Sequence, residues 1–407
     1  MEKFKTYLME DLIDEIAMGP FGSNIKVDCF VDDGIPVLNG SNLMGYKLNE
    51  DSFNYVTIEK ANSLNKANAY RGDIIITHRG TLGQIVYIPD NSLYDRYVIS
   101  QSQFRIKLNK QLALPEYVVY YFHTRIGQYR LLANASQVGV PAIARPTSTF
   151  RKVEIELPPI DEQKRIVSVL DSLSNKIELN NRINHNLEQQ AQAIFKSWFV
   201  DFEPYKDCEF VDSALGLIPK GWKNGALSDI STITMGQSPS GASFNENGDG
   251  LLFYQGRTEF GFRYPTIKLF TTEPTRYAEA NSILMSVRAP VGDINIATSK
   301  CCIGRGLASI KSKDKAFSFL LYTLKNKETE LDLYNGEGTV FGSINRKELE
   351  QLPIIVPPLD VIDSFNRIVY PLDKEIEKNC REVMILQETR DYLLPSLMTG
   401  RIITQHQ

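Results

Sequence analysis

Two arginines, Arg79 and Arg288, end similar short runs of β-branched and apolar residues. Each stands four residues ahead of a glycine, Gly83 or Gly292. A guanidinium carries a planar fork of donors that suits bidentate hydrogen bonds to carboxylate, to phosphate or to the O6/N7 edge of guanine. An arginine at a strand end can also form an ordinary surface salt bridge. The sequence therefore offers two matched sites for recognising a planar or anionic group, with the salt bridge as the alternative for each.

The elements that would position these arginines are repeated along the chain. Leu157–Asp161 (Leu-Pro-Pro-Ile-Asp) matches Val356–Asp360 (Val-Pro-Pro-Leu-Asp), 199 residues further on. Before each match lies a segment with short β-branched runs and turn residues, typical of strands and hairpins. Helical patterns occur near the ends of these segments, at Pro115–Thr124 and Phe317–Lys325. The sequence thus predicts two α+β modules, each followed by a long helix.

The long helices carry a seven-residue seam of mostly apolar residues, as a coiled coil requires. Asn180 and Asn379 occupy equivalent positions in the two seams. A polar seam residue costs stability but fixes register and partner number. Asn184, Trp198 and Phe199 are further candidates for a scaffold or partner-docking role, and for Trp198 plain seam packing is the favoured interpretation.

Each long helix follows a Pro-Pro pair, which stops the preceding strand because proline lacks an N–H and restricts the residue before it. Asp161 and Asp360 suit the N-cap position. Pro371 falls inside the second pattern, where proline kinks or breaks a helix. We therefore expect a short helix, a bend and a longer helix that ends near Leu394.

Connectivity favours an antiparallel helix pair, because the second module then closes on itself between the end of one helix and the start of the next. The expected fold is α+β: two globular modules joined by two long antiparallel coiled-coil helices, with a pseudo-two-fold internal repeat. The expected domains are residues 1–158, 159–203, 204–356 and 357–407.

The net charge of −4 does not indicate a nucleic-acid-binding protein, but the charge is unevenly distributed. Residues 60–152 contain 13 Lys and Arg against 4 Asp and Glu, and residues 257–313 contain 9 against 4. Phosphate contacts depend on such local basic patches more than on the overall charge. Chance clustering on a solvated surface is the alternative.

No apolar run approaches the roughly 20 residues that a membrane span needs, and the five cysteines are scattered without CxxC spacing. An odd, scattered set argues against a disulfide framework and against structural zinc. We expect a reduced, cytoplasmic protein without a membrane partner.

Sequence signatures of catalysis are absent. The chain contains neither a GxxxxGK[ST] loop nor an Asn-Pro-Pro-aromatic tetrapeptide, and none of its four histidines has metal-ligand spacing with another. His78, beside Arg79, could be a base contact or a general acid, and a ligand-facing or solvent-facing turn residue is the favoured interpretation. We expect no catalytic residue and no metal site in this chain.

Four motifs, in order along the chain, resemble those of the specificity subunits of type I restriction-modification systems. Leu157–Gln163 resembles the start of a conserved helix of that family, and Phe195–Phe202 resembles the end of its central helix. Leu215–Trp222 resembles the start of a target-recognition domain, and Leu393–Gly400 resembles the C-terminal tail. Two departures exist: the N-terminus lacks an Ile-Pro-x-x-Trp start, and Val361-Ile362 replaces the Glu-Gln of the first copy.

The resemblance implies that the two modules are target-recognition domains, each reading one half of a split site in double-stranded DNA, with the N-terminal module on the 5′ half. The helices would set the unread gap and dock two methyltransferase subunits, and two motor-nuclease subunits would complete the restriction enzyme. S-adenosylmethionine, ATP and Mg²⁺ would belong to those partners, and this chain would carry no cofactor.

Candidate DNA contacts are polar residues on or beside the matched runs and turns. Arg79 and Arg288 rank first, because bidentate arginine to guanine is the commonest specific contact. Gln101 and Gln103 could pair with adenine, or could only face solvent. The remaining candidates are Thr77, His78, Thr81, Gln84, Arg145, Arg257, Ser286 and Arg305.

Two other classes of protein stay open from the sequence. One is a coiled-coil scaffold for protein interactions without DNA binding, which the basic module centres and the four ordered motifs disfavour. The other is a self-sufficient enzyme, which methylation of DNA by the isolated chain would reveal.

Overall fold

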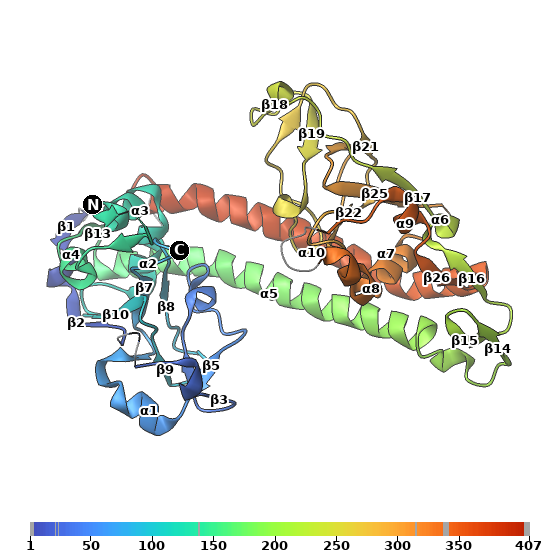
Figure 1. The fold of residues 1–407 in the computed structure, drawn as a ribbon. Coiled ribbons are helices and arrows are strands. Elements are labelled where there is room, and N and C mark those ends of the chain that lie inside the picture. Colours follow the sequence, from blue (N-terminus) through green and yellow to red (C-terminus); the bar gives the residue numbers. More distant parts are fainter. Residues whose placement is uncertain are drawn as a thin grey trace. The chain divides into compact units, whose positions relative to one another are not determined.

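The computed structural model describes residues 4–402 except 21, 23, 137–138, 314–315 and 337–341. The chain forms two compact units, Met1–Lys176 with Leu386–Gln407, and Ile177–Ile385. The division falls within two long helices, α5 (Ile160–Phe199) and α10 (Leu359–Met398). Each unit therefore holds one globular module, called module 1 or module 2, and one segment of each long helix (Figure 1).

Module 1 is built on a four-stranded antiparallel sheet with its most apolar strand inside. In spatial order the strands are β2 (Ile13–Met18), β10 (Gln103–Leu108), β7 (Ile74–Thr77) and β8 (Ile85–Tyr87). Ile74 and Ile76 face a core with helix α2, whereas Ile75 faces a core with the second sheet. Successive strand residues point to opposite faces, so a continuous apolar run indicates a strand covered on both sides.

The second sheet and the remaining elements of module 1 surround this centre. The second sheet has the order β3 (Phe30–Val31), β5 (Asn54–Val56), β4 (Ile35–Val37), β9 (Arg96–Val98) and β6 (Asn68–Tyr70). Two strand pairs accompany it, β1 (Lys5–Leu8) with β13 (Glu154–Leu157), and β11 (Ala135–Ser136) with β12 (Ala142–Ile143). The helices are α1 (Ile58–Ser63), α2 (Pro115–His123), α3 (Arg125–Leu132) and α4 (Pro146–Arg151).

Module 2 repeats both sheets of module 1 and the β1–β13 pair. Its first sheet has the order β17 (Ser231–Met235), β25 (Leu307–Ser312), β22 (Ile283–Ser286) and β23 (Ile294–Ile296). Its second sheet has the order β18 (Phe244–Asn245), β20 (Phe270–Thr271), β19 (Leu251–Tyr254), β24 (Cys301–Ile303) and β21 (Tyr277–Ala278). The pairs are β16 (Lys223–Ala226) with β26 (Pro353–Val356), and β14 (Phe210–Ser213) with β15 (Gly216–Pro219). The helices are α6 (Leu227–Ile230), α7 (Phe317–Lys325), α8 (Glu328–Asp332) and α9 (Arg346–Glu350).

The two modules agree in detail, which confirms the internal repeat and the α+β fold class. In both, the second sheet contains a parallel pair, β4 with β9 or β19 with β24, among antiparallel neighbours. The two helices expected near the module ends occur as α2 and α7.

The long helices are antiparallel where they pair in unit 2. Asn180 of α5 donates to Glu382 of α10 at 2.8 Å, and Asn184 approaches the Cys380 sulfur at 3.4 Å. In unit 1, Leu170 of α5 and Leu394 of α10 belong to one buried cluster. Apolar seam residues are buried in both units, as the periodicity predicts.

The break expected at Pro371 is wrong, because α10 runs from Leu359 to Met398 without interruption. Pro371 lacks an N–H and leaves the Arg367 carbonyl without its helical donor. Both residues are exposed, so water can satisfy that carbonyl, while Phe365, Val369 and Ile376 are fully buried on the opposite face. Tertiary packing therefore outweighs the local preference.

The helices also begin slightly earlier than expected. α5 starts at Ile160 and α10 at Leu359, which places Asp161 and Asp360 in the first turn and not at the N-cap. An acidic side chain in the first turn still favours the helix through the macrodipole. No helix in the described part of the chain is both long enough and apolar enough to span a membrane.

Candidate nucleic-acid interface

Arg79 is exposed at the end of β7, and the backbone around it is held on both sides. The Gly80 N–H donates to the Pro141 carbonyl at 2.8 Å, and the Ile143 N–H donates to the His78 carbonyl at 2.9 Å. These bonds form an antiparallel bridge between Arg79 and Ala142. The arginine therefore projects from a fixed backbone.

Arg288 at the end of β22 has the same setting. The Ala289 N–H donates to the Gly342 carbonyl at 3.0 Å, and the Ile344 N–H donates to the Val287 carbonyl at 3.1 Å, which bridges Arg288 to Ser343. Among the described residues, neither the Arg79 nor the Arg288 guanidinium has a side-chain hydrogen bond or ion pair. Among the described residues, neither arginine therefore forms the salt bridge considered as the alternative.

Thr77 and Ser286, the last residues of β7 and β22, are not surface candidates. Their side chains are 4% and 1% exposed. The Thr77 hydroxyl donates to Gln84 Oε1 at 3.0 Å; the Ser286 hydroxyl donates to the Pro290 carbonyl at 2.7 Å. We correct their expected role, because buried hydroxyls with internal partners shape the turn that follows the strand.

Gln103 is likewise buried, at 1% exposure, and its Oε1 accepts a hydrogen bond from the Ser100 N–H at 2.9 Å. Gln101 is exposed. Gln101 lies before β10, which begins at Gln103. The alternation of side chains along a strand therefore does not apply to this pair. Gln101 remains a candidate contact, whereas Gln103 closes the turn before the strand.

His78 is half-buried, and its Nε2 lies 3.2 Å from the Gln101 carbonyl oxygen. Burial lowers the pKa of His78, and the nearby Arg79 charge adds to this effect. Because a carbonyl can only accept, the neutral ring places its proton on Nε2. This geometry fits a turn residue whose ring connects the segments of His78 and Gln101.

Gln84 is tied on both ends of its amide, since Oε1 accepts from Thr77 and Nε2 donates to the Gly40 carbonyl at 2.9 Å. Thr81 and Arg145 are exposed. Arg145 follows β12, the strand whose Ala142 bridges to Arg79. Thr81 and Arg145 therefore lie in the two segments that meet at Arg79.

In module 2 the remaining arginine candidates differ in their surroundings. Arg257 forms an ion pair with Asp293, whose position in the β22–β23 turn corresponds to that of Gln84. The salt-bridge alternative holds for this residue. Arg305 is exposed in the turn before β25, and its backbone N–H donates to Ser238 Oγ at 3.2 Å.

The Ser238 contact reveals a loop that the sequence analysis did not select. Gly236 and its counterpart Gly19 each donate an N–H to the first sheet, to Leu307 at 2.8 Å and to Gln103 at 2.9 Å. A Cβ on Gly236 would lie 2.0 Å from the Gly304 oxygen, so only glycine fits this approach. The Met-Gly pair repeated before both loops was the available signal.

The helix candidates are scaffold residues. Asn180 and Asn184 are each 1% exposed, and Asn379 is 4% exposed. Phe199 is buried with its ring centroid 5.0 Å from that of Phe365 on α10, and Trp198 packs against the same ring at 6.1 Å. Trp198 thus packs in the seam, as favoured from the sequence.

Within the described residues, no cluster of three or more His, Cys, Asp or Glu side chains could hold a metal ion. The described features that stand out are instead the repeated loop clusters around Arg79 and Arg288. The described chain is a duplicated α+β module on shared helices, with one exposed arginine at the same place in each copy.

Comparison with known proteins assigns the chain to a family. Residues 29–189 and 219–383 match the family described as "Type I restriction modification DNA specificity domain". The two matches cover more than half of the 407 residues, so the chain belongs to this family.

Individual relatives agree with this assignment. The "Putative type I restriction enzyme MjaX specificity subunit" of Methanocaldococcus jannaschii is 30% identical over 91% of this chain and 87% of its own length. The type I restriction enzyme HindI specificity subunit of Haemophilus influenzae is 26% identical over 82% of this chain and 87% of its own. The crystal structure of a type I S subunit from M. genitalium, at 16% identity, has a TM-score of 0.60 and covers 100% of this chain and 97% of that one, which supports the fold.

Proposed function

We propose that this chain is the DNA-reading subunit of a type I restriction-modification complex, and that each module reads one half of a split site. The observation that carries the proposal is the pair of exposed arginines, Arg79 and Arg288, held by equivalent backbone bridges in the two modules. A projecting arginine can bond to O6 and N7 of guanine in the major groove. The N-terminal module would read the 5′ half.

Two modules on one chain gain affinity through effective concentration, but only when both half-sites match in separation and helical phase. The loops that surround the two arginines differ in sequence, so each half can have its own base preference. Differences between the loops, and not between the sheets, would then determine the target.

Equivalent apolar residues on the long helices support docking of two identical partners. Val169 on α5 and Ile368 on α10 stand 199 residues apart, and their side chains are 38% and 47% exposed. Exposed apolar side chains at matched positions suit a repeated protein interface. We propose that two methyltransferase subunits dock there and that two motor-nuclease subunits complete the restriction enzyme.

The chemistry in this proposal belongs to the partners. S-adenosylmethionine would bind the methyltransferase subunits, and ATP and Mg²⁺ would serve the motor-nuclease subunits. The specificity chain would itself be non-catalytic, and the partners would flip and methylate the adenine that it selects.

Mapping methylated adenines in cells that express the chain with its methyltransferase subunit tests the proposal. We expect a bipartite motif with one modified adenine in each half and a constant gap. A continuous palindromic motif, or failure of the reconstituted complex to bind any duplex, would refute the two-module proposal. Methylation by the isolated chain with S-adenosylmethionine would refute the non-catalytic role.

A further inference from the structure

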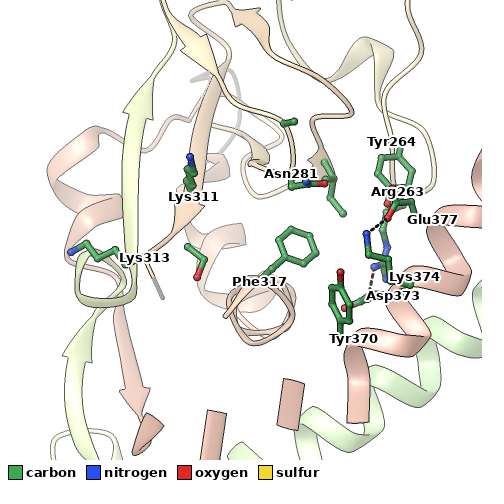
Figure 2. A pocket seen from close by; sticks show the side chains of 13 residues that line it. Arg263, Tyr264, Asn281, Lys311, Lys313, Phe317, Tyr370, Asp373, Lys374 and Glu377 are labelled. Atoms are coloured by element: carbon green, nitrogen blue, oxygen red, sulfur yellow. Dashed lines mark hydrogen bonds and ion pairs between the residues drawn. The ribbon is translucent and has the colours of Figure 1, made fainter. Parts of the chain in front are cut away.

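Arg263 connects module 2 to both long helices within unit 2. It lies in the loop between β19 and β20, yet it is only 3% exposed, although loops normally stay at the surface. Its guanidinium forms ion pairs with Glu188 of α5 and, at 2.6 Å, with Asp373 of α10. It also donates to the Tyr322 hydroxyl of α7 at 2.9 Å. Figure 2 shows Arg263 and Asp373 among the side chains that line one pocket.

Both carboxylates have second partners, so the cluster is balanced. Lys325 Nζ lies 2.7 Å from Glu188 Oε1, and the Ser318 hydroxyl donates to Asp373 Oδ2 at 2.5 Å. Burial alone would raise the pKa of Glu188, but the charges of Arg263 and Lys325 together outweigh burial and lower it. Two cations therefore face two anions in a buried site.

Such a cluster specifies geometry more than it adds stability. Buried ion pairs recover little more than their desolvation cost, and apolar side chains of similar size often stabilise a protein as well. Charge-assisted bonds from a planar guanidinium are directional, however, and an apolar contact is not. In unit 2, the Arg263 guanidinium bonds to α5, α10 and α7 at once, although its buried Nε has no partner among the described residues.

Module 1 has a structurally equivalent residue, Tyr46. The Tyr46 carbonyl accepts from the Tyr87 N–H of β8 at 3.1 Å, as the Arg263 carbonyl accepts from the Ile296 N–H of β23 at 2.9 Å. Tyr87 and Ile296 end equivalent strands. The same place in both modules therefore carries a side chain that reaches the helices.

The two anchors use different chemistry. The Tyr46 ring lies 4.6 Å from that of Tyr120 on α2, and the Arg390 guanidinium of α10 lies 4.8 Å from the Tyr46 centroid. Module 1 is thus held by ring packing and a cation–π contact, and module 2 by the Arg263 ion pairs. Tyr46 and Arg263 occupy equivalent places and contact a long helix by different interactions. This indicates that each residue helps to place its module on the helices.

We propose that Arg263 is a positioning residue that fixes the orientation of module 2 on its helix segments, and thereby the separation of DNA half-sites that the protein accepts. The inference rests on the proposed reading of a split site. Because Arg263 is buried, its effect on DNA is indirect.

The test uses the reconstituted methylase complex and duplexes whose half-sites stand at the native separation or one base pair closer or farther apart. The wild type should methylate one separation strongly. Arg263→Met should reduce the preference for the native separation over its neighbours by about tenfold or more, because a loosened frame no longer enforces one productive geometry. The base requirements within each half should stay unchanged. Arg346→Met, which removes an exposed arginine of α9 paired with Glu350, should behave as the wild type.

Wild-type separation preference in a folded Arg263→Met complex would overturn the proposal. Lost base selectivity in the second half alone would also overturn it, because Arg263 would then support the reading loops. If Arg263→Met fails to assemble, Glu188→Gln decides, since it keeps the side-chain shape and removes one charge. In Glu188→Gln, a smaller reduction of the separation preference with an intact thermal transition supports the proposal, and an unchanged preference refutes it. A wild-type complex without a bipartite motif would instead refute the proposed function.

Discussion

At the scale of single residues, Arg79 and Arg288 differ from the other candidates in being exposed, fixed by backbone bonds on both sides and without a partner among the described side chains. Arg257 resembles them in sequence but is paired with Asp293. Because the backbone is already ordered, binding of the guanidinium to a base has to order only the arginine side chain and not the loop. These two residues are therefore the strongest candidates for base contacts.

Replacing Arg288 by Ala should weaken binding to one half-site by about 1–3 kcal/mol, the usual contribution of a bidentate arginine–guanine pair. Arg79→Ala should have the same effect on the other half. Competition binding of the methylase complex against duplexes substituted in one half measures both effects. Arg346→Ala, exposed on α9, is the matched control. Equal losses for both halves from either single variant would indicate general phosphate binding or misfolding.

Ser286 allows a direct test of the corrected role of the strand-end hydroxyls. Its Oγ donates to the Pro290 carbonyl and accepts from the Asp293 N–H at 2.9 Å. Ser286→Ala removes two part-buried hydrogen bonds, to the Pro290 carbonyl and from the Asp293 N–H, so the free energy of unfolding should fall by about 1–3 kcal/mol. Denaturant unfolding gives this value, with Thr329→Ala on the exposed side of α8 as control. Altered base preference at unchanged stability would show that Ser286 contacts DNA.

At the scale of elements, periodicity predicted the long helices, α2, α7 and the repeated strands, because each has one or two faces buried in a regular pattern. The sequence could not reveal that Thr77, Ser286 and Gln103 are buried. These residues stand at strand ends, where the register against the next turn decides which way a side chain points. Arg263 was missed for a related reason, since its carboxylate partners are distant in sequence.

Pro371 lies inside the continuous helix α10, although proline usually kinks or breaks a helix. Its replacement tests how much stability this exception costs. Pro371→Ala restores the N–H that can donate to the Arg367 carbonyl and removes the ring clash in an otherwise continuous helix. The free energy of unfolding should rise, by at most about 3 kcal/mol, the difference between Pro and Ala inside a helix. Lys378→Ala, exposed on the same helix, should change it little. Unchanged or reduced stability in Pro371→Ala would mean that the proline ring makes a contact that outweighs its missing hydrogen bond.

At the scale of the whole molecule, a net charge of −4 is compatible with DNA binding because basic residues outnumber acidic ones in the central segment of each module. Residues 60–152 carry nine more basic than acidic side chains, and residues 257–313 carry five more. Each module therefore has its own electrostatic contribution, and affinity should fall with salt through both. Since each proposed recognition site lies within one compact unit, the two should behave as separable parts.

Separability predicts additivity in a double-mutant cycle. Arg79 and Arg288 belong to different units and share no described partner. When both halves stay engaged, the loss of binding free energy in Arg79→Ala/Arg288→Ala should equal the sum of the single losses within about 0.5 kcal/mol. Titration of the methylase complex with the native duplex at several salt concentrations measures all four corners of the cycle.

A double variant that loses clearly less than the sum would show that one module already releases its half-site in a single variant, because a detached module has nothing further to lose. The slope of log affinity against log salt distinguishes that case, since detachment removes a whole set of phosphate contacts and substitution of one arginine removes at most one.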